Sequence, residues 1–166
     1  MEFRHEWKHN INMSDMIAIR PRLRAVMQPD EHAENGKYEI RSLYFDSLSD
    51  KALREKLDGV NIREKFRIRY YNGDTSYILL EKKYKKGSLG SKTNALMTEE
   101  EAQKITDGHF DWMQGHKEPL IRELYDKMTM QGLRPKTIVD YTREPYTYPP
   151  GNVRITIDYH IHTGLF

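Results

Sequence analysis

Hydrophobic and charged residues alternate along several stretches of the chain, most clearly over residues 63–70, which read REKFRIRY. Successive side chains of a β-strand point to opposite faces of the sheet, so this stretch would place all its even-numbered apolar side chains on one face. Those side chains, Phe66, Ile68 and Tyr70, are expected in the core. The other face would carry four cations, Arg63, Lys65, Arg67 and Arg69. Because such a face repels itself unless an anion lies against it, the pattern predicts a polyanion site.

The same patterns predict the remaining elements of an α+β fold, in which helices are inserted into an antiparallel sheet. Asn72-Gly73 between two alternating stretches indicates a hairpin turn. Strands are expected at Glu2–His9, Tyr38–Asp46, Asn61–Tyr71, Thr75–Lys85, Leu89–Leu96, Pro135–Glu144 and Asn152–His160. A first helix is expected after Ser14 as N-cap, and Pro21 would kink it or delay its start. Another is expected after Thr98, with Glu101 completing a capping box. Two more are expected at Leu48–Leu57 and at Glu118–Gln131.

Composition narrows the class of protein. The 166 residues are 37% hydrophobic and 31% charged, which suits one domain over residues 1–166, and the net charge of +2 is too low for a general nucleic-acid coat. The absence of cysteine excludes disulfides, thiol nucleophiles and Cys-based zinc sites. No apolar run approaches the ~20 residues that span a bilayer, and the N-terminus lacks the apolar stretch of a signal peptide, so we expect a cytoplasmic protein without a transmembrane segment.

Basic residues at alternate positions recur on four predicted strands. A solvated outer face would explain one such strand, but the repetition favours a site for a phosphate chain, which Arg can bind through two parallel hydrogen bonds and Lys as a point charge. In the first strand, Glu6 between Arg4 and Lys8 fits either a salt-bridge row or a site for Mg²⁺ or Mn²⁺. The seven histidines show no metal-binding spacing, strand aromatics are expected in the core, and the chain has no Gly-rich phosphate loop.

Six motifs, taken in order, closely resemble the VTC domain, a polyphosphate polymerase domain of the triphosphate tunnel metalloenzymes, which include the CYTH-type phosphatases. They lie at residues 6–8 (EWK), 38–46 (YEIRSLYFD), 65–70 (KFRIRY), 80–83 (LEKK), 141–143 (YTR) and 153–158 (VRITID). The resemblance implies an antiparallel, barrel-like β-tunnel with peripheral helices. It also implies transfer of the γ-phosphate of ATP or another nucleoside triphosphate to polyphosphate, with Mn²⁺ or Mg²⁺ as cofactor.

The resemblance also implies roles for individual residues. The cations that match phosphate-gripping and catalytic tunnel positions are Lys8, Arg67, Arg69, Lys83, Arg143 and Arg154, with Lys92 as a further substrate-binding lysine. Glu6 and Glu81 match acidic positions and are the candidate metal ligands.

Two departures from the family pattern shape the expectation. Arg4 stands where the tunnel phosphatases carry a first Glu, which favours the polymerase branch. The chain stops at Phe166, before the final strand with its Glu and Lys, so the tunnel is expected to lack its closing C-terminal strand. The alternatives are a triphosphatase on the same scaffold and a non-catalytic polyphosphate-binding module, and a nucleic-acid binder ranks last. The sequence leaves the oligomeric state and any membrane partner open.

Overall fold

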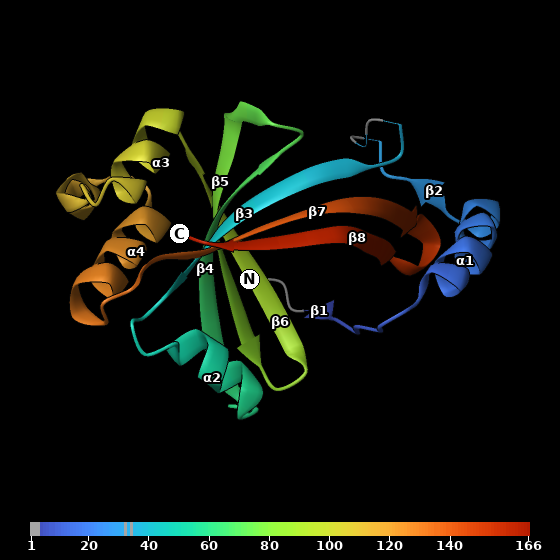
Figure 1. Cartoon of the computed structure of the whole chain (residues 1–166), viewed down its shortest axis with the longest axis horizontal. Coiled ribbons are helices and arrows are strands. Elements are labelled where there is room, and N and C mark those ends of the chain that lie inside the picture. Colours follow the sequence, from blue (N-terminus) through green and yellow to red (C-terminus); the bar gives the residue numbers. More distant parts are fainter. Residues whose placement is uncertain (1–3, 32, 34) are drawn as a thin grey trace.

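The computed structural model describes residues 4–31, 33 and 35–166, which form an α+β fold around one eight-stranded antiparallel sheet (Figure 1). The strands are β1 (Arg4–His5), β2 (Gln28–Pro29), β3 (Tyr38–Asp46), β4 (Ile62–Tyr71), β5 (Asp74–Lys86), β6 (Leu89–Met97), β7 (Arg134–Tyr148) and β8 (Val153–Leu165). The helices are α1 (Met13–Val26), α2 (Lys51–Leu57), α3 (Glu99–Thr106) and α4 (Pro119–Met130), with short 3₁₀ helices η1 (Asp111–Gly115) and η2 (Pro149–Gly151).

The sheet curls into a half-barrel. Its strand order is β1-β6-β5-β4-β3-β7-β2, and β8 pairs with β7. Figure 1 shows the β4–β6 part turned strongly against the β3–β7–β8 part, as the right-handed twist of long antiparallel strands requires. The expected α+β arrangement, consistent with a tunnel, is therefore confirmed.

One face of the sheet is covered by helices at both ends. At the β4–β6 end, Phe66, Ile68 and Leu80 pack with Ile121 and Leu124 of α4, and all five side chains are buried. Figure 1 shows α3 and α4 together on this side of the molecule. The alternation of residues 63–70 therefore buries its apolar half as expected, and Tyr70 packs at the edge of the same cluster.

At the β7–β8 end the same sheet face is covered by α1. Met16 and Leu23 of α1 pack with Tyr146 and Ile157 of the two strands. Glu144 is buried beside this cluster and accepts two hydrogen bonds from Arg20, at 2.9 and 2.8 Å, and further ones from two tyrosine hydroxyls. The opposite face carries no helix of these two clusters, and we call it the groove face.

Several boundaries differ from those predicted. The N-cap of α1 is Asn12, not Ser14, because Asn12 and Asp15 form a reciprocal capping box. The helix continues through Pro21, and the packing of Met16 and Leu23 holds the side of the helix that faces the sheet. Of the strand expected at Glu2–His9, only Arg4–His5 pairs with β6, and residues 1–3 lie outside the described part. Strands β7 and β8 run further than expected because they pair with each other over almost their whole length. In the described residues no helix is long and apolar enough to cross a bilayer.

Candidate functional site

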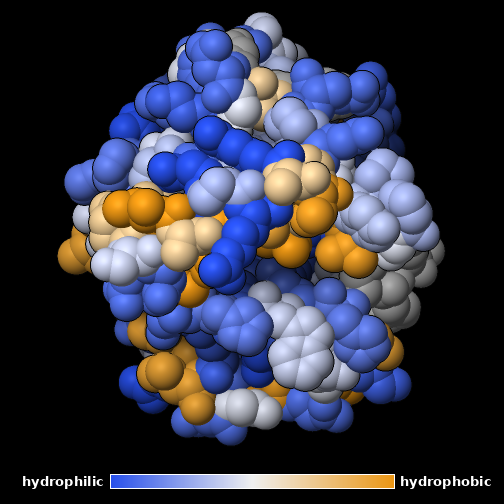
Figure 2. Space-filling model, turned by 90° about the vertical axis from the view of Figure 1, so that its right-hand side faces the viewer, coloured by the Kyte–Doolittle hydropathy of each residue, from blue (hydrophilic) through white to orange (hydrophobic). Residues whose placement is uncertain are grey.

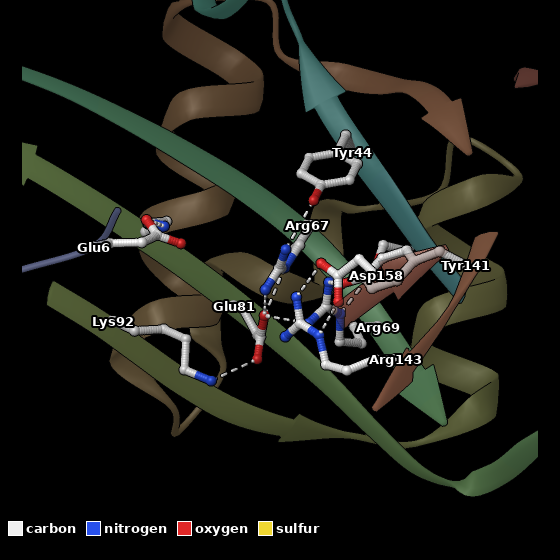
Figure 3. Close-up of polar contacts among 11 residues, drawn as sticks. Glu6, Tyr44, Arg67, Arg69, Glu81, Lys92, Tyr141, Arg143 and Asp158 are labelled. Atoms are coloured by element: carbon white, nitrogen blue, oxygen red, sulfur yellow. Dashed lines mark hydrogen bonds and ion pairs between the residues drawn. The ribbon is translucent and has the colours of Figure 1, made fainter. Parts of the chain in front are cut away.

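Charged and aromatic side chains from six strands, β3 to β8, meet on the groove face (Figure 3). Strand pairing sets Arg67 opposite both Tyr44 and Glu81, and Arg69 opposite Ser42, so these side chains share one face. The pairing of β7 with β8 sets Arg143 opposite Asp158. The sequence places a cation at every second position, and the sheet register decides which partner each cation meets.

Glu81 is the anionic centre of this cluster and is only 1% exposed. Its Oε2 accepts a hydrogen bond from Arg67 Nε at 2.6 Å and lies 4.0 Å from Arg69 Nη1, while its Oε1 accepts from Lys92 Nζ at 3.0 Å. Burial alone would raise the pKa of Glu81, but the charges of Arg67, Lys92 and Arg69 lower it below its ordinary value. Glu81 therefore stays ionised and holds three cations together.

Arg69 and Arg143 both lie near one aromatic ring. The guanidinium carbons of Arg69 and Arg143 lie 5.7 and 5.2 Å from the centroid of Tyr141. Arg69 is 2% exposed and donates to Ser42 Oγ and to the Tyr141 hydroxyl, both at 2.9 Å. Arg143 donates from Nε and Nη2 to the two oxygens of Asp158, each at 2.7 Å, and this pairing helps to raise the pKa of Arg143 against the effect of burial.

These arginines retain unused donors. Each guanidinium has five N–H groups, and the contacts above use two of Arg69 and two of Arg143. Neither Nη1 atom makes a hydrogen bond within the described structure, although Arg69 Nη1 lies 4.0 Å from Glu81 Oε2. An anionic oxygen could accept from these donors.

The pKa of Tyr44 indicates that the electrostatic potential in the groove is positive. Burial would raise the pKa of its phenol, but Arg67, Arg69 and Lys8 lower it below its ordinary value. Arg67 also donates to the Tyr44 hydroxyl at 2.8 Å, and its guanidinium carbon lies 5.6 Å from the ring centroid. A phenol whose pKa is lowered despite burial lies in an environment that stabilises negative charge.

The other predicted cations lie at different distances from this cluster. Lys83 forms an ion pair with Glu6, and both side chains are about half exposed. Lys8 is exposed, and within the described residues it makes no hydrogen bond or ion pair, although its charge lowers the pKa of both Glu6 and Tyr44. Arg154 lies at the far end of β8, where its Nη2 is 3.2 Å from Asp30. The structure thus brings Arg67, Arg69, Arg143 and Lys92 into one cluster, Lys83 and Lys8 beside it, and Arg154 apart from it.

The acidic residues fit a preformed metal site poorly. Both Glu81 oxygens are engaged by cations, and Glu6 directs one oxygen to Lys83. No group of three or more His, Asp or Glu side chains in the part of the chain that the structure describes is placed to hold a metal ion. The carboxylates of the groove therefore neutralise arginines and lysines. The assignment of Glu6 and Glu81 as metal ligands stays a prediction.

Four further residues of the groove were not predicted as site residues. Tyr44 and Tyr141 were expected in the core as strand aromatics, Ser42 and Asp158 were assigned no role, and each contacts an arginine of the cluster. Tyr141 and Asp158 were in phase with Arg143 and Arg154, and this phasing was the available signal.

Figure 2 shows the side of the molecule that α1 occupies. A hollow near the centre of this view is surrounded mostly by hydrophilic side chains, with apolar side chains beside it. Met13 and Ile17 of α1 contribute exposed apolar surface, each 61% exposed. The surroundings of this hollow are therefore mixed in character.

Comparison with known proteins places this geometry in context. The family model of the VTC domain matches residues 3–165. No curated protein sequence matches the chain. Among the solved structures that match, a candidate adenylate cyclase from Bacillus halodurans superposes with a TM-score of 0.57 at 13% identity, covering 98% of this chain and 71% of the other. At this identity the likeness shows the fold.

Proposed function

The chain belongs to the VTC domain family, and from this premise we propose that its groove binds the phosphates of a nucleoside triphosphate and of polyphosphate. We further propose that the domain transfers the γ-phosphate of the nucleotide to the polyphosphate chain. The observation that carries the proposal is the convergence of Arg67, Arg69 and Arg143 on the groove face, where N–H groups of Arg69 and Arg143 remain without a hydrogen bond in the described structure. We place the protein in the cytoplasm, where nucleotides are available.

Each side chain would make a distinct contribution. Arg69 and Arg143 are fixed by Ser42, Tyr141 and Asp158, so they can bind phosphate oxygens without first losing rotamer freedom. Phosphoryl transfer depends mainly on alignment and on neutralising the charge of the transferred group. Fixed guanidinium groups satisfy both requirements.

Lysines and the divalent ion have separate parts in the proposal. Lys8, Lys83 and Lys92 are more exposed than the arginines and would neutralise charge along the chain. Mn²⁺ or Mg²⁺ would arrive bound to the phosphates of the nucleotide, because such ions take most of their ligands from phosphate and water and need one or two carboxylates. Glu6, which has one oxygen outside its contact with Lys83, is the candidate to supply a ligand.

A second candidate function is a polyphosphate-binding module without catalysis. It is favoured by the engagement of Glu81 and Asp158 with cations and by the lack of a metal-binding group among the described residues. Binding and turnover therefore need separate experiments.

The binding experiment uses two matched arginines. Arg143 pairs with Asp158 on the groove face, and Arg41 pairs in the same bidentate manner with Asp140 on the helix-covered face. Calorimetric titration with tripolyphosphate should show about ten-fold or greater loss of affinity for Arg143→Ala, since a hydrogen bond to a charged group is worth about 1.5–3 kcal/mol. Arg41→Ala should bind as the unchanged protein does. Equal affinities for all three proteins would refute the proposed site.

The turnover experiment separates the three possible activities. The protein is incubated with ATP and Mn²⁺ or Mg²⁺, and the products are analysed on a polyacrylamide gel and by a phosphate assay. Long polyphosphate supports the polymerase, and free phosphate alone supports a triphosphatase. Binding without either product supports the binding module.

A further inference from the structure

The outward side of α2 carries leucines that no part of the described structure covers. Leu53 and Leu57 are 46% and 73% exposed, and at a spacing of four residues they are neighbours on one side of the helix. No residue of α2 is buried. Its other side, at Ala52 and Glu55, lines a cavity of about 300 Å³ together with residues of β4. α2 is therefore inverted relative to an ordinary surface helix, whose apolar stripe faces the core.

The apolar surface continues from α2 into the start of β4. The chain turns back on the helix here, because the backbone N–H of Val60 donates to the carbonyl of Glu55 at 2.9 Å. Val60 and Ile62 are both exposed. Figure 1 shows α2 at an extremity of the molecule, with no other element of the described structure beyond it. We call Leu53, Leu57, Val60 and Ile62 the α2 patch.

Cations surround the α2 patch. At 3.6 residues per turn, Arg54 and Lys56 flank the two leucines on the surface of the helix. Strand pairing sets Lys86 opposite Ile62. All three cations are exposed, and in the part of the chain that the structure describes their side chains make no ion pair. The apolar side chains are thus bordered by positive charge that is free to meet an anion.

The acidic residues around α2 mostly have partners of their own. Glu55 Oε1 lies 3.9 Å from Lys51 Nζ, and Asp50 Oδ1 lies 2.6 Å from Lys136 Nζ. Asp58 is exposed and makes no ion pair within residues 4–31, 33 and 35–166. Three cations against this one carboxylate leave the border of the α2 patch positive.

We propose that the α2 patch and its cations dock this end of the protein onto an anionic phospholipid surface. The apolar side chains would enter the boundary between headgroups and acyl chains, and the cations would contact the headgroup phosphates. Peripheral membrane proteins bind by this combination of apolar and basic side chains. The inference does not depend on phosphate binding in the groove, and it assigns a different ligand to a different surface.

A lipid surface fits the α2 patch better than a second copy of the chain does. In a two-fold symmetric contact the same patch meets itself. Arg54, Lys56 and Lys86 would then lie against the same cations of the other copy, and like charges oppose such a contact. An anionic bilayer instead offers negative charge at its surface and an apolar interior beneath it. The leucines also project outward from a helix, which suits insertion into lipid.

Vesicle flotation measures the proposed docking. The protein is mixed with phosphatidylcholine vesicles, or with vesicles that also contain phosphatidylglycerol, at constant ionic strength. Two variants change the patch and its border, namely Leu53→Gln/Leu57→Gln and Arg54→Gln/Lys56→Gln. Glutamine is a good helix former, so these exposed positions should stay helical. Circular dichroism checks that each variant is folded.

Each variant has a matched control elsewhere on the surface. Met13→Gln/Ile17→Gln removes two exposed apolar side chains from α1 at the same spacing of four residues. Arg22→Gln/Lys117→Gln removes two exposed cations outside the α2 end of the molecule.

The expected result separates the two contributions. The unchanged protein should bind the anionic vesicles more tightly than those of phosphatidylcholine alone. A cation near an anionic surface contributes about five-fold to the affinity, so Arg54→Gln/Lys56→Gln should lose roughly twenty-fold. Leu53→Gln/Leu57→Gln should lose roughly ten-fold or more on both kinds of vesicle. Both controls should bind as the unchanged protein does, and every variant should keep its calorimetric affinity for tripolyphosphate.

Four outcomes would overturn the inference. One is that the unchanged protein does not bind anionic vesicles, and another is that the leucine variant loses no more affinity than its control. Displacement from the vesicles by tripolyphosphate at constant ionic strength would assign lipid binding to the groove. A dimer in light scattering that the leucine variant abolishes would assign the α2 patch to a second copy. The proposed function is tested separately, since it fails when the unchanged protein does not bind tripolyphosphate.

Discussion

Glu81→Gln should make the protein less stable and, at the same time, a stronger binder of anions. Glu81 is buried and holds Arg67, Arg69 and Lys92. Glutamine keeps the shape of the side chain but removes the charge that offsets these three cations. Breaking a buried ion pair by removing one partner costs about 3–5 kcal/mol, and for a chain of this length a loss of about 3 kcal/mol lowers Tm by roughly 6–12 °C.

The gain in anion binding has the same electrostatic origin. Removing one negative charge at about 8 Å from a phosphate, at an effective dielectric constant of about 20, favours binding by roughly 2 kcal/mol before screening by salt. The added tripolyphosphate should therefore raise the Tm of Glu81→Gln by more than it raises the Tm of the unchanged protein. Thermal denaturation followed by circular dichroism, with and without tripolyphosphate, measures both effects.

The pH dependence supplies an internal check. Because the pKa of Glu81 is lowered in the folded protein, its contribution to stability is present above its unfolded pKa, near the ordinary value of 4.5, and is lost as the pH falls through the folded value. The Tm difference between the two proteins should shrink accordingly in acid. The control is Glu123→Gln, which removes a carboxylate that contacts Lys82 on the helix-covered face. The reasoning is refuted if Glu81→Gln is as stable as the unchanged protein at neutral pH, or if tripolyphosphate stabilises it less.

Three further predictions concern single contacts. The lowered pKa of Tyr44 should rise when tripolyphosphate binds. It is measured as the difference between absorbance titrations of the unchanged protein and Tyr44→Phe, and a constant pKa would contradict the assignment of the groove as the binding site. Asp158→Asn should release the Arg143 guanidinium and tighten tripolyphosphate binding several-fold, whereas weaker binding in calorimetry would mean that Asp158 mainly positions Arg143. Asn12→Ala should cost about 1 kcal/mol of helix-cap stability, a fall in Tm of roughly 2–4 °C, with unchanged affinity for tripolyphosphate.

Local sequence signals predicted the elements whose stabilising contacts are themselves local. The strand at Tyr38–Asp46 was predicted with its observed bounds, and the capping box of Thr98 and Glu101 forms as expected. The first helix was assigned the wrong cap because Ser14 and Asn12 are both good caps, and the choice depends on which residue can exchange hydrogen bonds with Asp15. The lengths of β7 and β8 could not be read from the chain, because their pairing continues wherever the partner strand provides hydrogen-bonding groups.

The sequence by itself determined that one face of the sheet would be apolar and the other cationic, because the period of a strand follows from its backbone geometry alone. It also indicated the hairpin of β4 and β5, but the pairing of Arg67 with Glu81 depends on a register shift between Arg69 and Tyr71. Only the tertiary structure decided that Arg69 meets Tyr141, that Arg143 meets Asp158, and that Arg154 turns to Asp30. Those contacts depend on the order, register and curl of strands far apart in the chain, which settle together with the packing of one sheet face against the helices.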